Sequence, residues 1–133
     1  MWIKRLVLDN FRSFYGHHDI PFERGINSVL GPNGAGKTTL IKALEYSLFG
    51  ITENVTEGEI INDKHKDECF KKRIAPSASV WVGLQHEEKR YIIKREFFSP
   101  EGGRISESLT VNGETVENSW IHEHLILPED FEL

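Results

Sequence analysis

The stretch Gly31-Pro32-Asn33-Gly34-Ala35-Gly36-Lys37-Thr38-Thr39 decides the fold of this chain. It has the spacing G-x-x-x-x-G-K-[ST] of a phosphate-binding P-loop. The short apolar run Ile26–Leu30 precedes it and is typical of a buried strand. After it, residues Thr39–Phe49 carry leucine at helical spacing, and Gly50 stands where a helix usually stops. Strand, glycine-rich turn and helix are the context that the motif requires, and together they predict an α/β fold of the P-loop NTPase type.

The residue types in this stretch suit a nucleotide triphosphate. Glycines let the backbone approach an anion closely, so that N–H groups and the start of the helix, near Lys37, can hold phosphate oxygens. Lys37 is the candidate catalytic residue because it would reach the β- and γ-phosphates, and the Thr38 hydroxyl would complete a Mg²⁺ shell. The predicted ATP-binding residues here are Pro32, Asn33, Gly34, Ala35, Gly36, Lys37, Thr38 and Thr39. The alternative is a chance glycine turn before a helix, and the flanking strand and helix argue against it.

Composition limits the class of protein. The chain has 133 residues, of which 38% are hydrophobic and 28% charged, as in an ordinary soluble domain. Its formal net charge of −5 argues against a surface that binds nucleic acid all over, although a local basic patch stays open. The single cysteine, Cys69, cannot form an internal disulfide. No apolar run approaches the roughly 18 residues of a membrane span, and the charged N-terminus is unlike a signal peptide. We therefore expect a cytoplasmic protein without a membrane partner.

Two short strands are predicted ahead of the P-loop. Residues Trp2–Asn10 mix apolar and basic side chains, which favours a strand at the edge or rim of a sheet. Residues His17–Phe22 form a second strand, hairpinned to the first, and Glu23–Gly25 then turns the chain toward the P-loop strand.

A set of motifs resembles a known family. The segment Asn10-Phe11-Arg12-Ser13-Phe14, Phe22 followed by Gly25-Ile26-Asn27, the P-loop, and Leu48-Phe49-Gly50 together resemble the SMC/RecF/SbcC family of ABC-type ATPases, which includes double-strand-break repair enzymes. The resemblance is specific over residues 1–50 and looser beyond. It implies the N-terminal lobe of an ABC-ATPase head with an antiparallel β subdomain. The family's coiled coil and C-terminal lobe, which carries the signature motif and Walker B acids, would lie outside this chain.

The resemblance also implies roles for single residues. Arg12 and Ser13 stand where the family contacts the phosphates and sugar of the nucleotide, and Asn33 where it faces the γ-phosphate and an opposing signature motif. The bland alternatives are a surface cation for Arg12 and a turn-capping hydroxyl for Ser13. Implied cofactors are ATP and Mg²⁺. Implied partners are the protein's own C-terminal lobe, a second head in a homodimer, DNA and a nuclease subunit.

The remainder of the single lobe, residues 1–133, divides by pattern. Residues 51–78 form a polar region in which the run Asp63–Arg73 mixes charges, which favours a solvated helix or loop over a basic loop contacting DNA or, near Asn62–Lys64, the base. Residues 79–117 alternate apolar and polar side chains, with a turn at Asn112-Gly113, and predict an antiparallel β meander. Residues 118–133 hold a short helix capped by Asn118 or Ser119 and an end that, by the resemblance, is truncated before the Q-loop glutamine.

Three functions remain as hypotheses. The first is the ATP-binding lobe of an ATPase that couples hydrolysis to DNA repair, recombination or DNA-targeting defence; the full-length protein would hydrolyse ATP, and this chain alone would bind it without turnover. The second is the nucleotide-binding domain of an ABC transporter, against which the short segment before the P-loop and the β meander argue. The third is a nucleotide sensor without catalysis. A metal site at His122 and His124 is not expected, because the two would not share a helix face.

Overall fold

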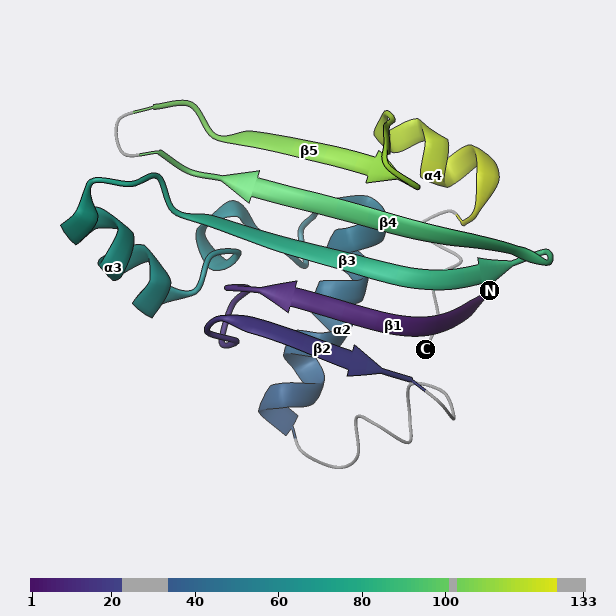
Figure 1. Ribbon diagram of the computed structural model, residues 1–133, viewed down its shortest axis with the longest axis horizontal. Coiled ribbons are helices and arrows are strands. Elements are labelled where there is room, and N and C mark those ends of the chain that lie inside the picture. The colour runs from purple at the N-terminus through teal and green to yellow at the C-terminus, as the bar shows by residue number, and fades with distance from the viewer. Residues whose placement is uncertain (23–33, 101–102, 127–133) are drawn as a thin grey trace.

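A six-stranded antiparallel sheet forms the body of the protein. The structure is a computed structural model that describes residues 1–22, 34–100 and 103–126, with the backbone alone for residues 34–37. The strand order is β2-β1-β3-β4-β5-β6, so the N-terminal hairpin and the later meander make one continuous sheet (Figure 1). Helix α2 lies across one face of this sheet, while α3 and α4 lie at its two ends (Figure 1).

The N-terminal strand is internal to the sheet. Strand β1 (Trp2–Asp9) pairs with β2 (His17–Pro21) on one side and with β3 on the other, both antiparallel. The predicted hairpin is therefore confirmed, but the prediction that the first strand lies at the sheet's edge is wrong. Lys4 and Arg5, which suggested an edge, occupy its exposed first half, whereas Leu6 and Leu8 are fully buried.

The predicted meander is confirmed. Strands β3 (Ser77–His86), β4 (Lys89–Phe98), β5 (Ser106–Val111) and β6 (Glu114–Thr115) follow one another in antiparallel order. Asn112 and Gly113 have φ of 51° and 85°, the positive pair that a type I′ turn requires. Glu87 and Glu88, in the turn between β3 and β4, also have positive φ. Residues other than glycine adopt this backbone conformation only at a cost in conformational energy.

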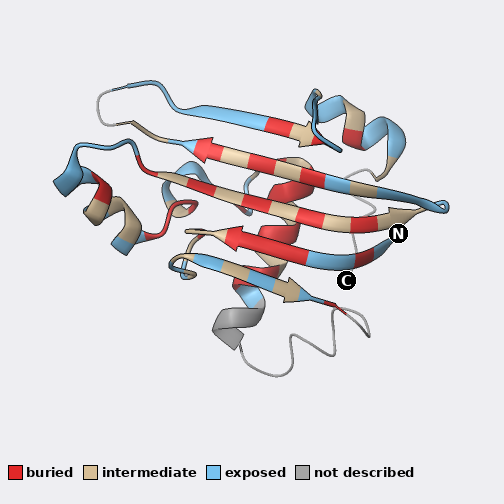
Figure 2. Ribbon diagram, in the orientation of Figure 1, coloured by how far each residue is buried: buried red, intermediate tan, exposed pale blue. Residues whose placement is uncertain are grey.

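Helix α2 (Gly34–Phe49) packs its leucines against the sheet. Leu40, Leu44 and Leu48 are buried against the inward side chains of β1, β3 and β4, whose alternation is visible in Figure 2. The helix begins three residues before the predicted start near Lys37, because its first N–H groups need no helical partner and glycine tolerates that position. It ends as predicted: Gly50 takes φ of 74° and its N–H bonds to Tyr46 O.

Three shorter elements complete the described chain. A 3₁₀ turn, η1 (Glu57–Glu59), leads to α3 (Asp63–Lys72), so the mixed-charge run is a helix with one buried side chain, Cys69. Helix α4 (Asn118–His124) begins after Glu117, so the predicted caps Asn118 and Ser119 are wrong; the Asn118 side chain instead binds Arg95. Ile121 of this helix is fully buried. Within the described ranges, no helix is long and apolar enough to cross a membrane.

Candidate nucleotide-binding site

The N-terminal end of α2 carries the second half of the P-loop motif. Gly34, Ala35, Gly36 and Lys37 form the first turn of this helix, and their side chains are not described; Pro32, Asn33 and the predicted strand Ile26–Leu30 lie outside the described residues. Thr38 is exposed at the helix surface. Thr39 is buried, and its Oγ1 lies 3.2 Å from Ser13 Oγ.

The loop that follows β1 is held at this end of α2. Asn10 and Arg12 both have positive φ, of 54° and 52°, so the loop turns sharply. Its shape is fixed by the segment before α3: Arg12 N–H donates to Ile60 O at 2.9 Å, and Asn62 N–H donates to Asn10 O at 2.8 Å. The Asn62 side chain adds a third bond, from Nδ2 to Arg12 O at 2.7 Å. The loop therefore presents Arg12 and Ser13 beside the first turns of α2.

The Asn62 side chain contacts helix α3 as well as the Arg12 loop. Its Oδ1 accepts a hydrogen bond from His65 N–H at 3.1 Å, which makes it the N-cap of α3. A second link joins the same two segments, because Tyr15 OH donates to Glu68 on α3 at 2.5 Å. That bond to a carboxylate raises the pKa of Tyr15. Helix α3 and the Arg12 loop are thus joined at both ends of the loop.

A carboxylate lies between two cations of the site. Glu59 Oε2 is 2.5 Å from Arg12 Nη1, and both Glu59 oxygens are 3.5 Å from Lys42 Nζ on α2. Thr56 N–H donates to the other oxygen at 3.0 Å. This backbone bond first, and then Arg12 and Lys42, lower the pKa of Glu59 despite its partial burial. The group is ionised at neutral pH, and the three side chains together carry one net positive charge.

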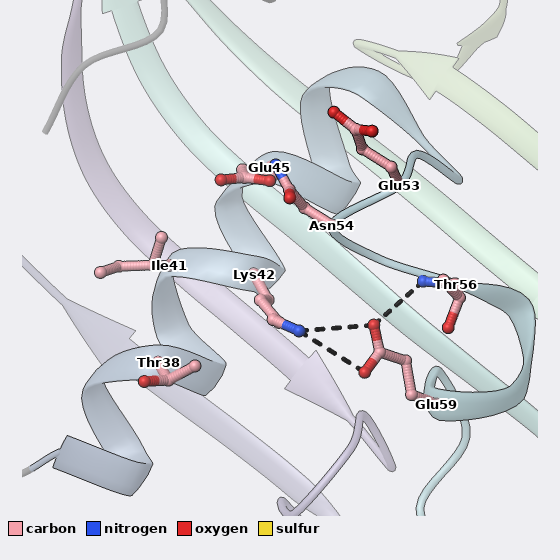
Figure 3. A pocket seen from close by; sticks show the side chains of 8 residues that line it. All are labelled: Thr38, Ile41, Lys42, Glu45, Glu53, Asn54, Thr56 and Glu59. Atoms are coloured by element: carbon pink, nitrogen blue, oxygen red, sulfur yellow. Dashed lines mark hydrogen bonds and ion pairs between the residues drawn. The ribbon is translucent and has the colours of Figure 1, made fainter.

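Two hollows meet at Glu59. The α2 pocket, of about 540 Å³, lies between α2 and the loop before η1 and is lined by Thr38, Lys42 and Glu59 among others (Figure 3). The Arg12 pocket, of about 340 Å³, is lined by Arg12, Ser13, Gly58, Glu59, Ile61 and Asp63. A helix N-terminus and the cations Arg12 and Lys42 are groups that bind phosphate, and a hydroxyl such as that of Thr38 can bind Mg²⁺, which prefers oxygen ligands.

Of the residues that the sequence indicated, the structure places the loop of Arg12 and Ser13 beside the first turns of α2, where Ser13 contacts Thr39. The sequence analysis did not indicate Glu59 or Lys42. A signal for Glu59 exists, because Thr56-x-x-Glu59 has the form of a capping box. Lys42 follows Thr38 by one helical turn and so shares its face.

A second missed residue lies at the far end of α2. Arg95 is 1% exposed, and its guanidinium donates to the carbonyls of Ser47 and Leu48 at 3.4 Å. Its Nη1 is also bonded to Glu107 at 2.9 Å and to Asn118 at 2.8 Å. Tyr46 OH donates to the other Glu107 oxygen, and burial raises the pKa of Tyr46. The C-terminus of α2 is thereby tied to β4, β5 and α4.

Other candidate chemistry is not supported. His122 lies beside Phe49, with ring centroids 6.2 Å apart, and His124 stacks on Trp120. Within the described part of the chain, no three histidine, cysteine or acidic side chains are grouped to hold a metal ion. Cys69 is a free cysteine with a buried side chain.

Comparisons with known proteins find similar chains. The family described as AAA domain matches residues 5–127. Chromosome partition protein Smc of Synechocystis sp. is 29% identical, over 100% of this chain and 13% of its own length. The DNA double-strand break repair Rad50 ATPase of Sulfurisphaera tokodaii is 37% identical, over 71% of this chain and 10% of its own. The chain thus spans about a tenth of the length of such relatives.

A solved structure has the same fold. The SMC head domain from Thermotoga maritima superposes with a TM-score of 0.56 at 22% identity, covering 92% of this chain and 41% of that one.

Proposed function

Because the chain belongs to the AAA domain family, as the N-terminal head region of an SMC/Rad50-type ATPase, we propose that it binds ATP with Mg²⁺ at the start of α2. One observation carries this proposal: the structure brings Arg12 and Ser13, far from the P-loop in sequence, to the helix that begins within the P-loop, through Ser13 Oγ and Thr39 Oγ1.

Each site residue then has a role. The backbone N–H groups of residues 33–36 would surround the phosphates. Lys37 would supply a positive charge to the β- and γ-phosphates. Arg12 would add a second cation from the β1 loop, with Ser13 beside it. Thr38 would hold Mg²⁺ through its hydroxyl oxygen, and Mg²⁺ there would neutralise charge on the β- and γ-phosphate oxygens.

The whole protein would couple this binding to work on DNA. We infer this from the chromosome partition and double-strand break repair functions in the names of its relatives. In that arrangement two heads engage around ATP, each P-loop facing the signature motif of the other, and hydrolysis releases them. A nuclease subunit is a further partner within this proposal. The present chain carries the binding half, so by itself it would bind ATP without turnover.

The transporter hypothesis receives less support. The relatives named above are a chromosome partition protein and a DNA double-strand break repair ATPase, and the solved structure that superposes is an SMC head domain. ATP hydrolysis by the full-length protein distinguishes the ATPase from a nucleotide sensor, which would bind ATP without hydrolysing it.

Binding of a fluorescent ATP analogue with Mg²⁺, measured by titration, tests the proposal. Lys37→Ala should weaken binding by about 10- to 100-fold, the range for losing one charge-assisted contact. Lys71→Ala is the matched control, because Lys71 is exposed on α3. Equal binding by wild type and Lys37→Ala would contradict the proposed site.

Hydrolysis by the full-length protein, with and without linear DNA, tests the coupling. DNA-stimulated turnover that Lys37→Ala abolishes is the expected result. Turnover that ignores DNA, in a protein that purifies with membranes, would favour the transporter.

A further inference from the structure

The surroundings of Glu59 raise the question of what this carboxylate does inside an anion-binding site. Its contacts are Arg12 Nη1 at 2.5 Å, Lys42 Nζ at 3.5 Å and Thr56 N–H at 3.0 Å. The carboxylate is therefore fixed from three directions by three separate segments: the β1 loop, α2 and the turn before η1.

Arg12 needs an external group to set the direction of its guanidinium. Its backbone is fixed on both sides, by Ile60 O and Asn62 Nδ2, but neither contact reaches the side-chain tip. Arg12 Nε is buried and finds no hydrogen-bond partner among the described residues. The side chain is 19% exposed, and Glu59 is its ion-pair partner within the described chain. The orientation of the guanidinium thus depends on Glu59.

The Arg12–Glu59 ion pair lies where two pockets meet. Glu59 lines both the Arg12 pocket and the α2 pocket, so it lies between Arg12 and the face of α2 that carries Thr38 and Lys42. Figure 3 shows Lys42 and Glu59 directed toward each other across the α2 pocket. The same two pockets are also lined by Glu45, Glu53 and Asp63, so Arg12 and Lys42 are the cations that they offer to a phosphate.

We propose that Glu59 is a positioning residue, which holds the Arg12 guanidinium in the orientation that binds the phosphates of a nucleotide at the start of α2. This inference rests on the proposed function. An arginine has five N–H donors in a rigid plane, so one edge can bind a carboxylate while the others remain for a ligand. Fixing the side chain in advance removes the entropy that it would otherwise lose on binding.

The test is a double-mutant cycle between residues 59 and 12. Glu59→Gln keeps the size of the side chain and removes its charge; Arg12→Ala removes the group that it positions. Glu57→Gln is the matched control, since Glu57 is exposed in the same 3₁₀ turn and makes no side-chain bond within the described residues. All variants, and Lys37→Ala, are titrated with a fluorescent ATP analogue and Mg²⁺ after thermal unfolding has established that each is folded.

Glu59→Gln should weaken ATP binding by about 3- to 10-fold, as expected for releasing one long side chain. In the Arg12→Ala background the same change should have no further effect, which a merely structural role for Glu59 would not produce. Glu57→Gln should bind like wild type.

Two results would overturn the inference. Glu59→Gln binding that equals or exceeds wild type would mean that the carboxylate does not help Arg12, or opposes it. An equal loss with and without Arg12 would mean that Glu59 acts by another route. Failure of the proposed function would give a different result, namely equal binding by wild type and Lys37→Ala.

Discussion

At Gly50 the chain must meet two conditions at once. The residue that ends α2 has φ of 74°, and an added Cβ would lie 2.9 Å from Arg95 Nη1. Glycine satisfies the backbone condition and leaves room for the guanidinium that caps the helix. One residue thus permits both the end of α2 and the buried cation beside it.

We expect Gly50→Ala to lower the free energy of unfolding by about 2 kcal/mol or more, because it combines backbone strain with a clash. Gly113→Ala isolates the backbone cost, since Gly113 has φ of 85° and open space, and should lose about 1 kcal/mol. Gly58→Ala meets neither condition and should be close to neutral. Urea unfolding measures all three; a Gly50→Ala loss equal to that at Gly113 would show that Arg95 moves freely.

The charge of Glu59 should also appear in the dependence of stability on pH. Its pKa is below the usual 4.5 in the folded protein, so its contribution is present above pH 4.5 and is lost as pH falls through the folded pKa. The difference in unfolding free energy between wild type and Glu59→Gln should therefore be largest near neutral pH and fade in acid. It should stay below about 1 kcal/mol because the pair is partly exposed. A difference that grew on acidification would contradict this assignment.

At the scale of elements, α2 is held differently at its two ends. Its first turns carry exposed Thr38 and contact the β1 loop and Glu59 through Thr39 and Lys42, while its C-terminal carbonyls bind buried Arg95. A cation at a helix C-terminus also complements the helix dipole. The buried Arg95 network thus anchors α2 at the end that faces away from the proposed nucleotide.

Arg95→Met should destabilise the protein by about 3–5 kcal/mol, because it leaves Glu107 without its cation and the last carbonyls of α2 without their donor. Lys94→Met is the matched control. Lys94 lies on the opposite face of β4 from Arg95, is partly exposed and pairs with Glu96, so its replacement should cost less than about 1 kcal/mol. Chemical unfolding compares the two. Similar losses would mean that the Arg95 network adds nothing beyond a surface ion pair.

Asn62 allows the helix cap and the loop contact to be separated. Asn62→Ser keeps an N-cap oxygen for α3 but loses the bond to Arg12 O, whereas Asn62→Ala loses both. Relative to serine, alanine should cost about 1 kcal/mol of stability. Both variants should weaken binding of the ATP analogue alike, since the Arg12 loop is loosened in each. Wild-type binding by Asn62→Ser would show that this bond does not support the site.

At the scale of the whole molecule, the continuous sheet makes β1, β3 and β4 the least exposed strands. We expect hydrogen exchange followed by mass spectrometry to find the slowest amides in these central strands and faster exchange in β2 and β6 at the edges. Fast exchange throughout β1 would contradict its internal position.

Local patterns predicted much of this fold, and long-range pairing limited the rest. The alternation of β3 and β4 and the Asn112-Gly113 turn are readable because neighbouring residues determine them. The edge position assigned to β1 failed because its second partner, β3, is remote in sequence. The cap assigned to Asn118 failed because Arg95 takes that side chain, which no local signal reveals.

Local motifs likewise indicated part of the candidate site. The P-loop spacing indicated Thr38 and Thr39, and the family motif indicated Arg12 and Ser13. Glu59 and Lys42 were missed because an ion pair across three segments exists only once α2, the β1 loop and η1 are packed together.

The pairing of β1 with β3 has a consequence for how the protein acquires its site. Leu6 lies opposite Val82, so forming this contact closes a loop that contains the whole of α2, η1 and α3. Closing so long a loop costs more chain entropy than forming the tight β3–β4 hairpin, and contacts of this kind tend to form late. Arg12 and Ser13 follow directly from β1. We therefore expect the proposed nucleotide site to be completed late in folding, when β1 pairs with β3.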